Sequence, residues 1–133
     1  MNTQDSILVQ LLNIKSTSTS TGVPTAVDMA PYFPVMRRSV KFVVGYVAGT
    51  TASGDEVVTI TIEECASTAT ASFTSVLGPD GSTGTWTSTA SGSTVFEWHG
   101  NLNYRYIRAK VVSAGTNPKN VASVFALLPK RAA

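Results

Sequence analysis

Acidic pairs, one histidine and one cysteine are the side chains in this sequence that could carry catalysis or hold a metal. The acids adjoin one another at Asp55-Glu56 and at Glu63-Glu64. Neighbours on a strand point to opposite faces of a sheet, so the two carboxylates of a pair cannot share a proton or a metal ion. We interpret them as edge or surface charges, with one ion pair to a basic strand.

His99 is the single histidine, and it follows a tryptophan at an expected strand end. A Ser-His-Asp triad would need His99, but no G-x-S-x-G motif marks a nucleophilic serine. Cys65 stands beside two glutamates rather than beside basic groups that would activate a thiolate, which predicts a buried and inert cysteine. One cysteine and one histidine cannot form a zinc site of the usual kind, and no phosphate-binding fingerprint occurs. The sequence therefore predicts no catalytic residue, no metal and no cofactor, and a protein that is not an enzyme.

The stretch LNYRYIRAKVV, Leu102 to Val112, predicts a strand with two different faces. One face carries Ile107, Ala109 and Val111, and the other carries Tyr104, Tyr106, Arg108 and Lys110. The first face is expected in the core. The second could stack single-stranded nucleic acid, pair internally with Glu63 or Glu64, or contact a protein.

The net charge of +2 is small for a nucleic-acid groove, which leaves internal pairing and a protein contact as open interpretations. The candidate contacts with a partner or with a second copy are Arg37, Arg38, Tyr104, Tyr106 and Arg108. Four aromatic residues, Phe73, Trp86, Phe96 and Trp98, could instead line a sugar platform. Aromatic residues of a small β-domain belong to the core far more often, so we expect them there.

Length and composition set the class of protein. The 133 residues suit one domain, and only 14% are charged, while 33 are serine or threonine, which favours strands and turns. The start MNTQDSILVQLLNIK lacks the basic region and cleavage site of a signal peptide. No apolar run approaches the roughly 20 residues that span a bilayer. We expect a chain made in the cytoplasm that binds neither membrane nor nucleic acid.

Short strands separated by polar turns are expected along most of the chain. The clearest are RSVKFVVGYVA, predicted to be a central strand, and EVVTITIEECA, whose Val58, Ile60 and Ile62 alternate with polar residues. Asp80-Gly81 after Pro79 predicts a turn. About eight strands and no amphipathic helix predict an all-β fold, an antiparallel β-sandwich of jelly-roll type.

The first 22 residues are predicted to lie outside this sandwich. The apolar segment DSILVQLLN is followed by the low-complexity stretch STSTSTG, Ser16 to Gly22, which has the composition of a flexible linker. We therefore assign residues 1–22 to an N-terminal arm with its linker and residues 23–131 to the sandwich domain. Deletion of Met1 to Lys15 is expected to leave folding intact.

A family resemblance rests on a series of segments in a fixed order. These are AVDMAPY, RRSVKFVVGYVAGT, VTITIEE, YRYIRAKVVSAGTNP and VASVFALLPKR, and they span Ala26 to Arg131. Their order resembles that of small structural proteins of tailed bacteriophages, the capsid cement or decoration proteins of β-sandwich type. The loop after Glu64 departs from the pattern, because ECASTATASF stands where an Asp-Gly turn is expected.

The resemblance implies a non-enzymatic protein on the outer surface of an icosahedral capsid that bridges neighbouring major capsid proteins. It implies the major capsid protein as partner, location in the virion, and self-association as a dimer or trimer. Two alternatives stay open at this point. The chain could be a head-completion or tail component of the virion, or a carbohydrate-binding module that uses Trp86 or Trp98.

Overall fold

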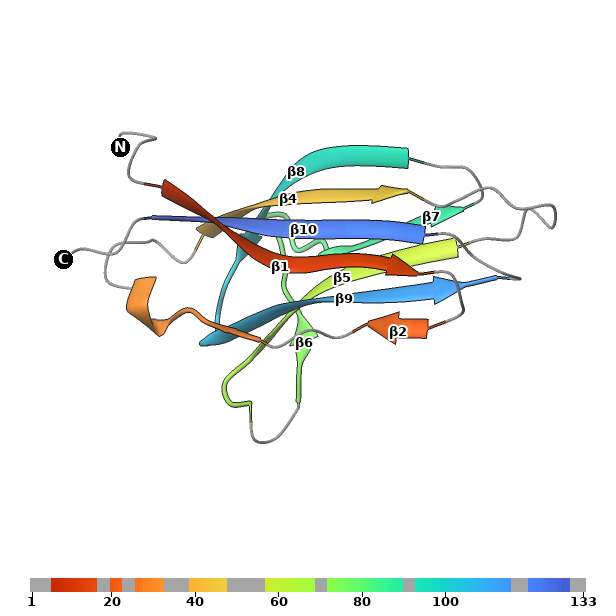
Figure 1. Cartoon of the computed structure of the whole chain (residues 1–133). Coiled ribbons are helices and arrows are strands. Elements are labelled where there is room, and N and C mark those ends of the chain that lie inside the picture. Colours follow the sequence, from red (N-terminus) through yellow and green to blue (C-terminus); the bar gives the residue numbers. More distant parts are fainter. Residues whose placement is uncertain are drawn as a thin grey trace.

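The computed structural model of the chain is a sandwich of two antiparallel sheets, and it describes residues 6–16, 20–22, 26–32, 39–47, 57–68, 72–89, 93–115 and 120–129 (Figure 1). Sheet A has four strands, in the order β1 (Ser6–Ser16), β10 (Asn120–Pro129), β4 (Ser39–Val47) and β8 (Ser93–Asn101). Sheet B is centred on β9 (Tyr106–Ala114) and β5 (Val57–Cys65). Strands β4, β5 and β9 are long strands that the apolar pattern of the sequence predicts.

Short strands complete the two edges of sheet B. Beyond β9 lie β2 (Ser20–Gly22) and β3 (Val27–Asp28), which pair with different parts of the same edge. Beyond β5 lie β6 (Thr74–Ser75) and β7 (Thr85–Thr89), again on one edge. The ten strands of the described residues therefore occupy eight positions, four in each sheet.

The order of these positions is that of a jelly roll. Numbered along the chain, with β2 and β3 sharing one position and β6 and β7 another, they run 1-8-3-6 in sheet A and 2-7-4-5 in sheet B. Two interlocked Greek keys give this arrangement. The predicted antiparallel jelly-roll sandwich is confirmed, and so is the central position of β4, which lies between β10 and β8.

The prediction of a separate N-terminal arm over residues 1–22 is wrong for the strands β1 and β2. The first pairs with β10 from Ser6 opposite Pro129 to Ser16 opposite Asn120, with one irregularity between Gln10 and Leu12. The second pairs with β9. Backbone N–H and C=O groups at the edge of β10 are open to pairing, and the backbone of β1 supplies their partners. The expected tolerance to deletion of Met1 to Lys15 loses its basis.

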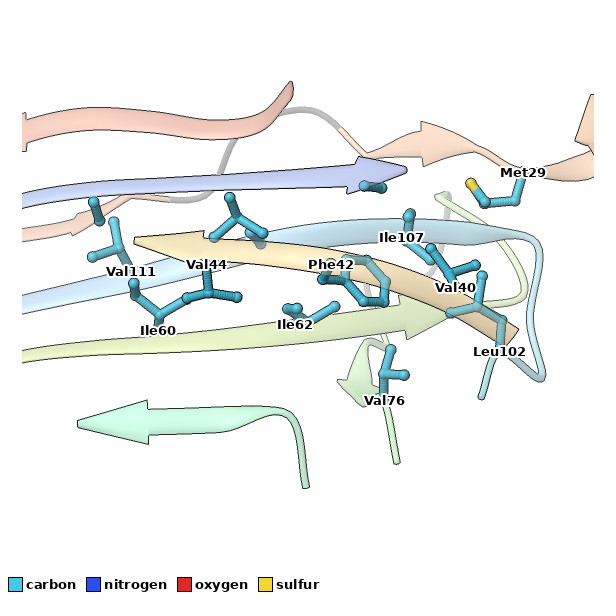
Figure 2. Packing of buried hydrophobic residues seen from close by; sticks show 14 of the residues in the cluster. Met29, Val40, Phe42, Val44, Ile60, Ile62, Val76, Leu102, Ile107 and Val111 are labelled. Carbon is cyan, nitrogen blue, oxygen red and sulfur yellow. The ribbon is translucent and has the colours of Figure 1, made fainter. Parts of the chain in front are cut away.

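The core lies between the sheets and is filled by alternate residues of the long strands (Figure 2). In β4 the side chains of Val40, Phe42 and Val44 are buried, and they face Ile60 and Ile62 of β5. On β9, the predicted inner row is confirmed, since Ile107, Ala109 and Val111 are all buried. The period-2 burial follows from strand geometry, in which successive side chains leave opposite faces.

A row of aromatic rings fills the space between β4 and β8 of sheet A and β7 of sheet B. It runs from Tyr46 through Phe96, Trp86 and Trp98 to Phe42, with ring centroids 5.0 to 6.4 Å apart. Three of the contacts are edge-to-face, the arrangement that aromatic quadrupoles favour. The predicted core role of Trp86, Phe96 and Trp98 is confirmed, because these partly buried rings pack against the core.

Candidate interaction surface

The two-faced stretch predicted over residues 102–112 is divided between a loop and a strand. Strand β9 begins at Tyr106, so Tyr104 belongs to the loop that joins β8 to β9. Arg37 and Arg38 lie outside the described residues, and the strand that follows them, β4, belongs to sheet A rather than to the sheet of β9. The structure therefore brings Tyr104, Tyr106 and Arg108 into one region.

Arg108 is held within the molecule by an acid and a ring. Its Nε donates to Oε1 of Glu63 at 3.0 Å, directly across the β5–β9 pair. Its guanidinium carbon lies 3.7 Å from the centroid of the Phe73 ring. Both partners of the ion pair are largely shielded from solvent, with 20% and 12% of the side chains exposed. Of the two interpretations left open for Arg108, the structure shows the internal pairing with Glu63. Phe73 covers this pair instead of joining the core.

Arg105 forms a two-point ion pair with Asp28 of β3. Nε and Nη2 of the arginine donate to Oδ1 and Oδ2 of the carboxylate at 2.8 and 2.7 Å. The hydrogen bond from Arg105, together with the N–H of Ala30, lowers the pKa of Asp28 to about 2. The same partner raises the pKa of Arg105, whose guanidinium also lies 5.2 Å from the ring centroid of Tyr106. A forked guanidinium suits this bidentate geometry.

The carboxylate of Glu64 holds the backbone of the loop between β8 and β9 by hydrogen bonds. This side chain is buried, contrary to the surface position predicted for it. Oε2 accepts the N–H groups of Asn103 at 2.8 Å and Tyr104 at 3.3 Å, and the amide of Asn103 reaches Oε1 at 3.4 Å. A buried carboxylate is tolerated here because several N–H donors replace its lost hydration.

Four attachments therefore hold the loop between β8 and β9, and one of them is the ion pair of Arg105 with Asp28. Leu102 is buried in the core, Glu64 binds the next two N–H groups, and the carbonyl of Arg105 accepts the N–H of Met29 at 2.7 Å. Tyr104 is nevertheless 46% exposed. We call the region formed by Tyr104, Arg105, Tyr106, Arg108 and their partners Asp28, Glu63 and Phe73 the tyrosine–arginine surface.

The tyrosine–arginine surface is compensated in charge. Both of its arginines bind carboxylates, and on sheet A Lys41 binds Glu97 at 2.8 Å. A surface that grips phosphates needs cations that are free to neutralise them. The arrangement therefore favours contact with a folded protein, where paired charges and exposed aromatic rings are compatible.

The residues first considered for chemistry are placed apart from one another. His99 is exposed on β8, whereas Cys65 is buried at the end of β5 and donates its thiol to the carbonyl of Ser67 at 3.0 Å. Within the described ranges, no group of three or more His, Cys, Asp or Glu side chains is placed to hold a metal ion. In the same part of the chain, no helix has the length and apolar character to cross a membrane.

Sequence reasoning missed two members of the tyrosine–arginine surface, Asp28 and Phe73, and it also missed the buried position of Glu64. Asp28 lies on a two-residue strand far from Arg105 in the chain, and no local pattern links them. The burial of Glu64 could have been predicted from the alternation along β5. This residue continues the buried row of Val58, Ile60 and Ile62, so strict alternation would have placed it inside.

Fold and surface together define an antiparallel jelly-roll protein whose tyrosine–arginine surface combines exposed aromatic side chains with paired charges. No protein-family model matches the chain, and no curated protein matches it in sequence. A solved structure from a Bacillus endospore appendage, a disulfide-linked pilus, is similar to it with a TM-score of 0.48 and 14% sequence identity. The similarity covers 96% of this chain and 89% of the pilus chain.

Proposed function

We propose that this chain is a non-enzymatic structural protein that binds the outer surface of an icosahedral phage capsid and cements neighbouring major capsid proteins. The phage assignment rests on the order of segments from Ala26 to Arg131, which resembles that of decoration proteins. The binding role rests on one observation of the structure. Tyr104 is exposed on a loop that is held by a buried leucine and by hydrogen bonds to Glu64 and Met29.

A fixed aromatic side chain is an efficient anchor for a protein contact. Tyrosine buries a large area while few rotatable bonds become ordered, and tyrosine and arginine are enriched among residues that dominate binding energy. Because Glu64 and Asp28 already hold the loop, little backbone entropy remains to be lost on binding. Many copies on one shell then act together even when each contact is modest.

Self-association as a dimer or trimer is part of the proposal, with Tyr104 and Tyr106 available to a second copy as well as to the capsid. Sedimentation of the isolated protein would measure this. A dimer or trimer that dissociates when Tyr104 is replaced by alanine would assign the surface to self-association. A stable monomer would leave the capsid as the partner of the surface.

The test of the capsid contact is occupancy on purified shells. Tyr104→Ala should weaken binding by about 10- to 100-fold, the range of a binding hot spot, while Tyr104→Phe should bind nearly as well as the original chain. Val95→Ala, which removes an exposed apolar side chain from β8, is the control. Full occupancy by folded Tyr104→Ala would contradict the contact, and a few copies per particle rather than hundreds would point to a head-completion or tail component.

A further inference from the structure

An open depression lies along strand β8, apart from the tyrosine–arginine surface. It encloses about 610 Å³ and is bounded by the turn before β7, by β7 itself and by β8. Its lining consists of Pro79, Asp80, Ser82, Thr83, Thr85, Trp86, Glu97, Trp98 and His99. The two tryptophans of the chain therefore both contribute to this one place.

The apolar wall of the depression is rigid. The indoles of Trp86 and Trp98 meet edge to face, with centroids 5.1 Å apart and planes at 78°. The ring of Phe96 contacts Trp86 with centroids 5.0 Å apart, and the buried ring of Phe42 contacts Trp98 with centroids 5.8 Å apart. Rings that are braced on the core side keep their remaining surface in one position, as a binding site requires.

Glycines allow the chain to close around the indole of Trp98. A methyl group at Gly100 would come within 2.6 Å of this ring, and one at Gly84 within 2.9 Å. At Gly78 it would meet the ring at 3.4 Å and the Asp80 carboxylate at 3.1 Å. The turn thus lies directly against the ring, which places polar groups beside an aromatic surface.

The polar part of the lining offers both acceptors and donors. Oδ1 of Asp80 accepts the hydroxyl of Ser82 at 2.6 Å and its N–H at 3.1 Å, and these bonds lower the pKa of Asp80. Glu97 is 59% exposed, and Lys41 binds its Oε2 at 2.8 Å, which compensates its charge. His99 is exposed on the same strand. These groups surround the indoles with ionised acceptors and hydroxyl and imidazole donors.

We propose that this depression binds a neutral pyranose unit of a glycan. A pyranose ring has a face of C–H groups that packs on an aromatic surface, and its hydroxyl edge forms hydrogen bonds with carboxylate, imidazole and hydroxyl groups. The open shape suits one ring of a larger chain better than an enclosed cavity would. The ion pair with Lys41 compensates the charge of Glu97, so Asp80, which is held by the neutral Ser82, is the one carboxylate of the lining whose charge is not paired within the described residues.

The site is separate from the proposed capsid contact, because it shares no residue with the tyrosine–arginine surface. A structural protein that holds one face against its particle could use the depression, at the outer edges of β7 and β8, to bind surface glycans. Failure of glycan binding would leave the capsid proposal unaffected, and failure of capsid binding would leave the glycan site unaffected.

The experiment uses the full chain with methyl glycosides of glucose, galactose, mannose and N-acetylglucosamine as probes. Saturation-transfer NMR at about 10 mM detects the weak affinities expected for single sugars. Intrinsic tryptophan emission gives a second readout, since both fluorophores line the depression. A glycan array then identifies the extended ligand.

The variants are His99→Ala and Glu97→Gln, each of which should weaken binding at least fivefold without loss of folding. Val95→Ala is the matched control, because Val95 is exposed on the same strand but does not line the depression. Binding of at least one glycoside that is lost in both variants and kept in the control supports the proposal. No saturation transfer to any glycoside, or equal binding by the variants and the original chain, would overturn it. Choline tests the rival possibility that the indoles bind a cation, and tighter binding of choline than of any sugar would also overturn the proposal.

Discussion

Replacement of Ile107 by alanine tests the central assignment of the fold, the inward face of β9. Its side chain is fully buried and belongs to the core cluster between the sheets. The change removes three carbons, worth about 0.8 kcal/mol each in transfer free energy, or about 2.4 kcal/mol together. A cavity that closes only partly adds about 1 to 2 kcal/mol. We expect the free energy of unfolding to fall by about 3.5 to 4.5 kcal/mol.

Urea unfolding followed by tryptophan emission measures this loss, because Trp86 and Trp98 pack against the same core. Leu77→Ala is the matched control, since it removes the same number of carbons from a side chain that is 42% exposed. It should cost less than about 1 kcal/mol. A loss below about 1 kcal/mol for Ile107→Ala, with an unchanged dependence on urea, would refute the inward assignment.

Three further predictions concern polar and close-packed positions. Glu64→Ala should cost about 1 to 3 kcal/mol, because it leaves partly buried N–H groups without their acceptor. Glu97→Ala at an exposed site should cost under about 1 kcal/mol in the same urea titration. The depressed pKa of Asp28 contributes stability that is complete above its unfolded value near 3.8 and is lost as the pH falls towards 2. Asp28→Asn should remove that part of the acid dependence of thermal unfolding, and an unchanged profile would contradict the pairing with Arg105. Gly100→Ala should cost about 1 to 3 kcal/mol through overpacking and shift the tryptophan emission, and a neutral effect on both would show that the ring has room to move.

The fold class and the faces of the long strands could be predicted because both depend on local patterns. Alternation of Val58, Ile60 and Ile62 with polar residues gives the inner face of β5, and it does the same for β9. Regularly spaced strands separated by turns, with no amphipathic helix, leave few architectures open. The turn at Asp80-Gly81 was also local, and Gly81 has the positive φ of 81° that such a turn favours.

The rest could not be predicted because it depends on which distant segments meet. An apolar segment at the start of the chain has the same composition whether it is an arm or an edge strand, and only the open edge of β10 decides between them. The ion pair between Asp28 and Arg105 joins residues 77 positions apart. Glu64 was misplaced for a different reason, since the penalty for burying a carboxylate outweighed the alternation until the N–H donors of the following loop were known.

The pairing of β1 with β10 has a consequence for the order in which the molecule is made. In sheet A the first strand of the chain, β1, pairs with the last, β10, and Ser6 lies opposite Pro129. Strand β10 lies between β1 and β4, so during synthesis these two strands have no partner on their facing edges until β10 has left the ribosome. Such a topology folds slowly, on a scale of about milliseconds to seconds, because distant ends must meet before the contacts stabilise them. Until that moment two unpaired strand edges are open to other copies of the chain, so the yield of folded protein should fall as the rate of expression rises.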